Sequence, residues 1–230
     1  MNQKLATLTT KDNISIITLD DGKANVFSPA MIEDINECLD KVPTDEGALV
    51  ITGREGILSG GFDLKVISSG DMKAIHEMTL SGFRLLSRIL SFPRPVIGVC
   101  TGHAIALGTF LLCCCDYRIG AKGDFMIGAN EMRTNMVIPI PILELIRFRV
   151  SQRHKYRAIL GAEMYSIETA VDAGLMDQTV EQEKLMEEAL HKAEDLATMG
   201  HPSYSLTKEL FINDVALKIN NALDEIDAVT

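Results

Sequence analysis

A glycine pair followed by an aromatic and an acidic residue is the first segment of the chain suited to chemistry. Gly60-Gly61-Phe62-Asp63 comes after the strand-like run at 48–52. Paired glycines permit positive φ and leave the next backbone N–H unhindered, so the N–H of Phe62 can point into a cleft. There it would donate a hydrogen bond to an oxygen on which negative charge develops. Gly-Gly alone also fits an ordinary turn before a helix.

Further segments follow this turn at a distinctive spacing. They are Pro95–Val99, which leads through Gly102–Gly108 into an apolar helix, then Cys115-Asp116-Tyr117-Arg118-Ile119, and then Asn130-Glu131. Together with Ser59–Lys65, in this order, they resemble the crotonase superfamily, also called the enoyl-CoA hydratase/isomerase superfamily. The Asn-Glu pair and the Cys-Asp-Tyr-Arg-Ile segment are closest in pattern to the Δ3,Δ2-enoyl-CoA isomerases.

The resemblance implies an oxyanion hole made of two backbone N–H groups, those of Phe62 and Leu107. Leu107 aligns with the middle glycine of the family's usual Gly-Gly-Gly run, which reads Ala106-Leu107-Gly108 here. It precedes an apolar helix, whose N-terminus adds partial positive charge at the same place. Leucine and alanine in place of two glycines should narrow the acyl channel.

The resemblance also makes Glu131 the catalytic carboxylate, although a lone glutamate is also consistent with a solvated surface charge. Phe110 stands where hydratases of the family carry a first glutamate. A phenyl ring cannot orient or deprotonate water, and its apolar surface would raise the pKa of Glu131. Proton transfer within a substrate needs only one carboxylate. Enoyl-CoA isomerase is therefore the first prediction, and enoyl-CoA hydratase and a non-catalytic acyl-CoA-binding protein are the alternatives.

The substrate positions follow from the same resemblance, with coenzyme A as part of the substrate and no separate cofactor or metal. Lys23 and Lys65 could contact phosphate groups, although surface lysines are equally consistent with the sequence. His103, beside the expected hole, is interpreted as structural, with a substrate contact as the alternative. The predicted substrate-binding residues are Lys23, Ala24, Val26, Ser59, Gly61, Asp63, Leu64, Lys65, Gly108, Phe110 and Pro139.

The elements needed to position these residues can be predicted from hydrophobic periodicity and capping signals. Residues 4–19 predict a β-hairpin, Ser28-Pro29 begins a helix, and Ser69-Gly70-Asp71 begins a helix that runs to Pro93. Alternating strands, glycine loops and helices indicate an α/β fold. The resemblance specifies it as a crotonase-like spiral of ββα units, with a core over 1–195 and a short helical region over 196–230.

The second half of the chain is predicted to be mostly helical. A helix capped by Ser151 runs to Gly161, a helix capped by Ser166 stops at Gly174, and a pair of helices follows Pro202, interrupted at Asn220-Asn221. The apolar run over 138–146 offers more hydrophobic surface than one core face can bury. We therefore expect a homotrimer or a dimer of trimers, the assemblies typical of the family.

Composition argues against nucleic-acid binding and against a membrane-spanning protein. The 230 residues carry a formal net charge of -10, and nucleic-acid binding requires a basic face. No apolar run approaches the ~20 residues that cross a bilayer, and a cytoplasmic location is expected. The five cysteines include Cys113-Cys114-Cys115, whose side chains would diverge on a helix. They are predicted to be buried free thiols in a reducing compartment.

Overall fold

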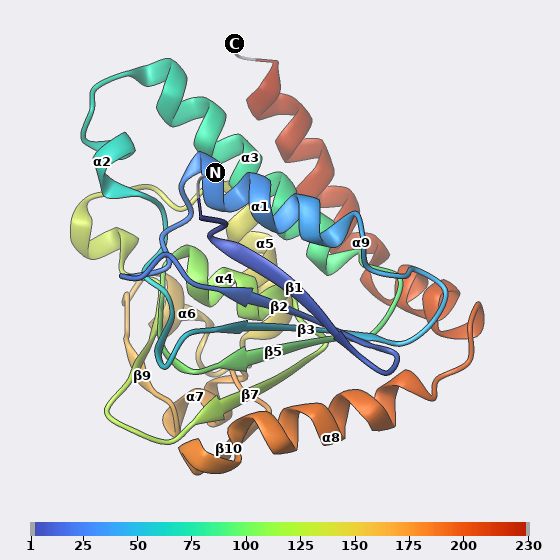
Figure 1. Ribbon diagram of the computed structural model, residues 1–230. Coiled ribbons are helices and arrows are strands. Elements are labelled where there is room, and N and C mark those ends of the chain that lie inside the picture. Colours follow the sequence, from blue (N-terminus) through green and yellow to red (C-terminus); the bar gives the residue numbers. More distant parts are fainter. Residues whose placement is uncertain (1–2, 229–230) are drawn as a thin grey trace.

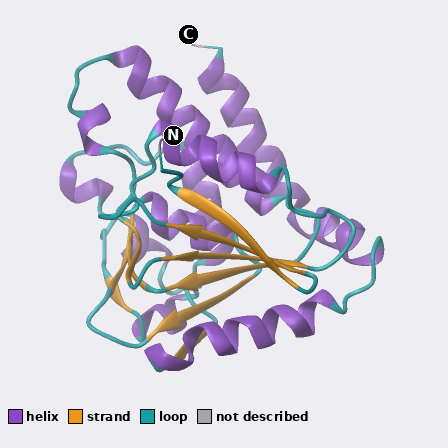
Figure 2. Ribbon diagram, viewed as in Figure 1, coloured by secondary structure: helices purple, strands orange, loops and turns teal. Residues whose placement is uncertain are grey.

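A six-stranded, mostly parallel sheet forms the centre of the computed structural model, which describes residues 3–228 (Figures 1 and 2). Its strands lie in the order β1-β2-β3-β5-β7-β10. Only the hairpin β1/β2 is antiparallel, which confirms the predicted opening of the fold. The strands are β1 (Ala6–Lys11), β2 (Ile14–Leu19), β3 (Ala48–Gly53), β5 (Val96–Cys100), β7 (Tyr117–Ala121) and β10 (Gln178–Val180).

A second sheet of very short strands carries the candidate site. It consists of β4 (Gly56–Ser59), β6 (Gly102–Ile105), β8 (Met126–Gly128) and β9 (Tyr165–Ser166), in that order. Each of β3, β5 and β7 is followed within a few residues by a strand of this second sheet, and then by helical structure. This repetition is the expected spiral of ββα units, and the predicted fold class is confirmed.

The helices cover both faces of the large sheet. Figure 1 shows α1, α3 and α9 above the sheet and α8 below it. The α-helices are α1 (Pro29–Leu39), α2 (Leu64–Ile67), α3 (Met72–Leu90), α4 (Leu107–Cys114), α5 (Ile140–Arg149), α6 (Lys155–Ile159), α7 (Thr169–Ala173), α8 (Leu185–Ala197) and α9 (Ser203–Asp227). Two 3-10 turns, η1 (Glu131–Thr134) and η2 (Gln182–Lys184), complete the order.

Capping residues mark three helix starts as the sequence indicated. The Ser28 side chain accepts a hydrogen bond from the Met31 N–H, with Pro29 at the first helical position. Asp71 accepts from two N–H groups at the start of α3. Ser166 Oγ accepts from the Thr169 N–H at the start of α7. Each side chain satisfies N–H groups that have no partner inside the first helical turn.

Two predictions about the later helices are wrong. Ser151 caps no helix, because α6 begins only at Lys155 and the Ser151 hydroxyl donates instead to the Asp172 carbonyl. Asn220 does not interrupt the last helix, since α9 is continuous over Ser203–Asp227. The Asn220 side chain accepts a hydrogen bond from Ser87 Oγ on α3 at 2.8 Å. A tertiary partner therefore compensates the weak helix propensity of asparagine.

Helix α9 is fixed to the large sheet by a buried ion pair. Lys208 Nζ lies 2.6 Å from Asp116 Oδ2, and both side chains are largely buried. The same carboxylate oxygen accepts from the Val96 N–H at the start of β5. Desolvation lowers the pKa of Lys208, which the neighbouring Asp116 carboxylate opposes.

Most apolar side chains of the run over 138–146 are buried within the protein. Ile138, Ile142, Leu145 and Ile146 are buried, whereas Ile140 is 53% exposed. The argument from surplus hydrophobic surface in this run is therefore wrong. The five cysteines are free and buried as predicted, and burial raises the pKa of Cys113 to about 11. Among the described residues, no helix has the length and apolar character needed to span a membrane.

Candidate active site

The turn after β4 is fixed by hydrogen bonds to the segment that precedes α1. The Phe27 N–H donates to the Gly61 carbonyl at 2.8 Å, and the Gly60 N–H donates to the Ala24 carbonyl at 2.8 Å. Ser59 Oγ donates to the Asn25 carbonyl and accepts from the Gly61 N–H. Gly61 has φ +96, a conformation that favours glycine. The predicted positions at 24–27 and 59–62 therefore lie side by side.

A second turn, between β6 and α4, approaches the first one closely. Ala106 has φ 50 and ψ -117, a region that alanine rarely occupies and that costs on the order of 1–3 kcal/mol. Leu107 is then the first residue of α4. A Cβ atom built on Gly61 would lie 3.0 Å from Ala106 Cβ and 3.6 Å from the Leu107 nitrogen. The two turns are thus in direct contact at the glycine.

Both expected oxyanion donors lack a hydrogen-bond partner in the described part of the chain. Across residues 3–228, neither the Phe62 N–H nor the Leu107 N–H donates a hydrogen bond to another protein group. Phe62 follows a glycine with positive φ, and Leu107 follows the strained Ala106. Gly108 lets α4 approach β4, since a Cβ there would lie 2.6 Å from the Ser59 carbonyl oxygen. The arrangement can hold two N–H donors beside one oxygen.

Glu131 is tied to the second turn through β8. The Ala106 N–H donates to the Gly128 carbonyl at 2.9 Å, and Thr109 Oγ1 accepts from the Gly128 N–H at 2.9 Å. Glu131 follows three residues later as the first residue of η1. Its Oε2 is buried without a hydrogen-bond partner in the described part of the chain. This desolvation raises the pKa of Glu131, as expected for a carboxylate that works as a base.

Phe110 is a core residue on α4. It is 3% exposed, and it borders a void of only about 10 Å³ together with Thr109, Ala129 and Ile146. Such a void holds at most one water molecule. The position at which hydratases are expected to carry a glutamate is therefore filled by a hydrocarbon ring in a dry environment.

The expected coenzyme A segment is a loop organised by a carboxylate. Asp21 accepts hydrogen bonds from the N–H groups of Lys23, Asn25 and Val26. Burial opposes ionisation, but these hydrogen bonds outweigh it and lower the pKa of Asp21. The Lys23 side chain is exposed, which leaves its charge available to a phosphate group.

The other predicted substrate positions lie at the edge of the site. Asp63 caps α2 by accepting from the Lys65 N–H, and Leu64 is 67% exposed. The Lys65 side chain is exposed on the same short helix. Pro139 is the residue before α5, on the chain segment that follows Glu131.

Three further residues position the candidate site. The sequence did not identify Thr109 or Gly82, and it left two roles open for His103. Thr109 is buried and also donates to the Ala104 carbonyl, so it joins β6 to β8. Gly82 on α3 leaves room for the Phe62 ring. His103 Nδ1 accepts from the Met126 N–H, and its ring contacts Phe125 edge-on. No local pattern marks Thr109 or Gly82, because their importance arises from neighbours distant in sequence.

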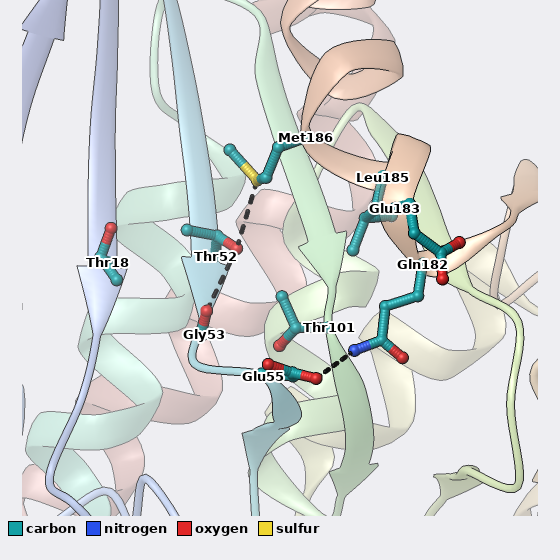
Figure 3. Close-up of a pocket in the computed structure, with 9 residues that line it drawn as sticks. All are labelled: Thr18, Thr52, Gly53, Glu55, Thr101, Gln182, Glu183, Leu185 and Met186. Atoms are coloured by element: carbon teal, nitrogen blue, oxygen red, sulfur yellow. Dashed lines mark hydrogen bonds between the residues drawn. The ribbon is translucent and has the colours of Figure 1, made fainter.

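A larger cavity lies elsewhere in the molecule and contains none of the predicted site residues. It has a volume of about 640 Å³ and is located where β2, β3 and β5 end, beside the start of α8 (Figure 3). Threonine hydroxyls line it together with Glu55, which accepts a hydrogen bond from Gln182 at 2.8 Å. Neither lysine nor arginine is among its lining residues. It therefore lacks the positive charge that would favour the phosphates of coenzyme A.

Comparison with known proteins is consistent with this geometry. A family model described as "Enoyl-CoA hydratase/isomerase" matches residues 9–228. The chain belongs to the enoyl-CoA hydratase/isomerase family. Proteins of this family act on acyl-CoA substrates, so the chain is assigned to a family of enzymes that use coenzyme A thioesters.

Relatives in the enoyl-CoA hydratase/isomerase family carry both activities in their names. A putative enoyl-CoA hydratase of Thermus thermophilus is 28% identical over 88% of this chain and 81% of its own length. A probable enoyl-CoA hydratase from Mycobacterium tuberculosis has a TM-score of 0.93 and 38% identity, with 97% of this chain and 95% of the other covered. A second structure of the same M. tuberculosis protein, described as an enoyl-CoA isomerase, has a TM-score of 0.92 and 37% identity, with 98% of each chain covered.

Proposed function

We propose that the protein is a Δ3,Δ2-enoyl-CoA isomerase that moves a double bond from the 3 to the 2 position of an acyl-CoA. Two observations carry this proposal together: Glu131 has a buried carboxylate oxygen without a partner in the described chain, and a buried phenyl ring, Phe110, stands where a hydratase is expected to carry a second carboxylate. A single carboxylate can serve as base and then as acid. The two structures of the M. tuberculosis relative are named isomerase and probable hydratase, so that relative is compatible with this activity but does not separate it from hydration.

In the proposed reaction, the thioester oxygen accepts hydrogen bonds from the N–H groups of Phe62 and Leu107. Ionised Glu131 removes a proton from C2, and the electron pair moves into the thioester to give a dienolate stabilised by the two donors. Protonated Glu131 then delivers its proton to C4, and the double bond forms between C2 and C3. The carboxylate is regenerated and no water is consumed.

Enoyl-CoA hydratase is the second candidate, favoured by the name of the Thermus relative. Water addition requires a second polar group to orient the water, at the position that Phe110 fills. His103 is the nearest substitute, but its Nδ1 already accepts from the Met126 N–H. A protein that only binds acyl-CoA would have no use for a desolvated carboxylate, which costs stability.

The deciding experiment compares two substrates on the purified protein. We expect 3-hexenoyl-CoA to be converted to the conjugated 2-enoyl thioester, which is followed by its ultraviolet absorbance. Crotonyl-CoA should be hydrated far more slowly, if at all. Rapid loss of crotonyl-CoA with formation of the 3-hydroxy product would instead assign the hydratase, and turnover of neither substrate would favour the binding protein.

We also propose that the protein assembles as a homotrimer or a dimer of trimers. Large apolar side chains that are exposed in the single chain support this proposal, because they would be buried at subunit contacts. Val137 is 89% exposed in the segment after Glu131, and Leu210 and Phe211 on α9 are 80% and 70% exposed. Light scattering at micromolar concentration tests the assembly, and a monomeric mass would contradict it.

A further inference from the structure

The side chains of the two expected oxyanion residues meet on one helix. A Cβ atom built on Gly82 of α3 would lie 2.6 Å from Phe62 Cε1, 2.7 Å from Phe62 Cζ and 3.4 Å from Leu107 Cδ2. The Phe62 ring therefore rests directly on the α3 backbone, beside the Leu107 side chain. The adjacent Phe83 ring meets it edge-on, with centroids 5.7 Å apart and planes at 71°.

These contacts fill the space between the expected oxyanion hole and α3. The backbone N–H groups of Phe62 and Leu107 would hold the thioester oxygen, so the first acyl carbons must lie within a few ångströms of both side chains. Gly82 supplies a flat surface for the ring, and Phe83 restricts its rotation. An alanine at position 62 would leave this space open to an acyl chain.

We propose that Phe62, seated on Gly82 and flanked by Leu107, closes the α3 side of the site and restricts the enzyme to short acyl chains. We call these three residues the acyl gate. The proposal deepens the proposed function, on which it rests, by specifying the substrate class as short-chain enoyl-CoA. Phe62 thus has two separate roles, because its backbone N–H would bind the oxygen while its side chain would limit chain length.

The test compares kcat/KM for 3-decenoyl-CoA with kcat/KM for 3-hexenoyl-CoA, so that a general loss of activity cancels in the ratio. We expect a low ratio for the wild-type protein and a rise of at least about tenfold in Phe62→Ala, the scale on which a hydrophobic pocket discriminates small changes in substrate size. Gly82→Ala should lower the ratio, because its Cβ displaces the ring toward the hole.

Phe148→Ala is the matched control. Phe148 is also a half-buried phenylalanine, but it lies on α5 and packs against Phe211 of α9. Its substitution should leave the ratio unchanged. If Phe62→Ala does not fold, Phe62→Leu is assessed by the same ratio.

Equal wild-type turnover of the two chain lengths, or an unchanged ratio in the Phe62 variant, would overturn the acyl gate. Calorimetric binding of hexanoyl-CoA and decanoyl-CoA separates this outcome from failure of the proposed function. If the wild-type protein isomerises neither substrate, the isomerase proposal fails, yet a selective gain in decanoyl-CoA affinity in Phe62→Ala still supports the gate. An equal change for both ligands would reject the gate as well.

Discussion

Two largely buried carboxylates of this protein differ in their hydrogen-bond and ion-pair partners. Asp116, between α4 and β7, pairs with Lys208 at 2.6 Å and also accepts from the Val96 N–H at 2.9 Å. Glu131, after β8, has a buried Oε2 with no partner in the described chain. Desolvation raises the pKa of Glu131, and the Asp116 pair attaches the last helix to the sheet.

The difference separates a group that holds the fold from a group suited to reaction. A buried carboxylate oxygen without a partner costs free energy, and a protein can retain it where the raised pKa serves a proton transfer. A buried carboxylate with a cation and an N–H donor is compensated, but removal of either partner leaves a charge without compensation. The comparison predicts which substitutions affect stability and which affect activity.

The largest effect is expected from Lys208→Met, which removes the cation and keeps the hydrocarbon volume. The free energy of unfolding should fall by about 3–5 kcal/mol, because the Asp116 carboxylate stays buried without its partner. Denaturant unfolding measures the change. Lys218→Met is the matched control on α9. Lys218 is exposed and its Nζ lies 3.5 Å from Glu144 Oε2, and such exposed ion pairs contribute about 0–1 kcal/mol. Equal losses in the two variants would mean that burial of the Asp116–Lys208 pair does not determine the cost of removing its cation.

Glu131→Gln should abolish proton transfer without unfolding the protein. Loss of a positioned general base is expected to lower kcat on 3-enoyl-CoA on the order of 10²-fold or more. The wild-type profile of kcat/KM against pH should lose activity on the acid side at a pH above the usual glutamate pKa of 4.5, because burial raises the pKa of Glu131. Glu55→Gln, in the separate cavity of Figure 3, is the control. Wild-type turnover in Glu131→Gln would exclude Glu131 as the base.

The smallest effect concerns stability in the same variant. The folded protein binds the Glu131 proton more tightly than the unfolded chain, so the wild-type residue favours folding most at low pH. This contribution is lost as the pH rises through the raised pKa. Glu131→Gln should therefore be more stable than wild type at pH 8, by roughly 1 kcal/mol. The gain should vanish below pH 4.5, where both states carry the proton, and thermal unfolding across this range measures it. A constant difference at every pH would mean that desolvation of the charge is not its cause.

The sequence by itself determined the features that depend on neighbours along the chain. The hairpin of β1 and β2 follows from alternation around a turn, and the starts of α1 and α3 follow from Ser28 and Asp71. Hydrogen bonds of this kind join residues two or three positions apart, so local chemistry specifies them. The ordered motifs also indicated the family and the positions of Phe62, Leu107 and Glu131.

The tertiary structure decided what depends on residues that are distant in sequence. Strands of two to four residues, such as β9 and β4, are too short to show a periodic pattern and exist because neighbouring strands pair with them. Asn220 remains helical because Ser87 meets it, and the Phe62 ring is seated because α3 presents Gly82. The raised pKa of Glu131 has the same origin, since burial is a property of the packed molecule and not of the residue.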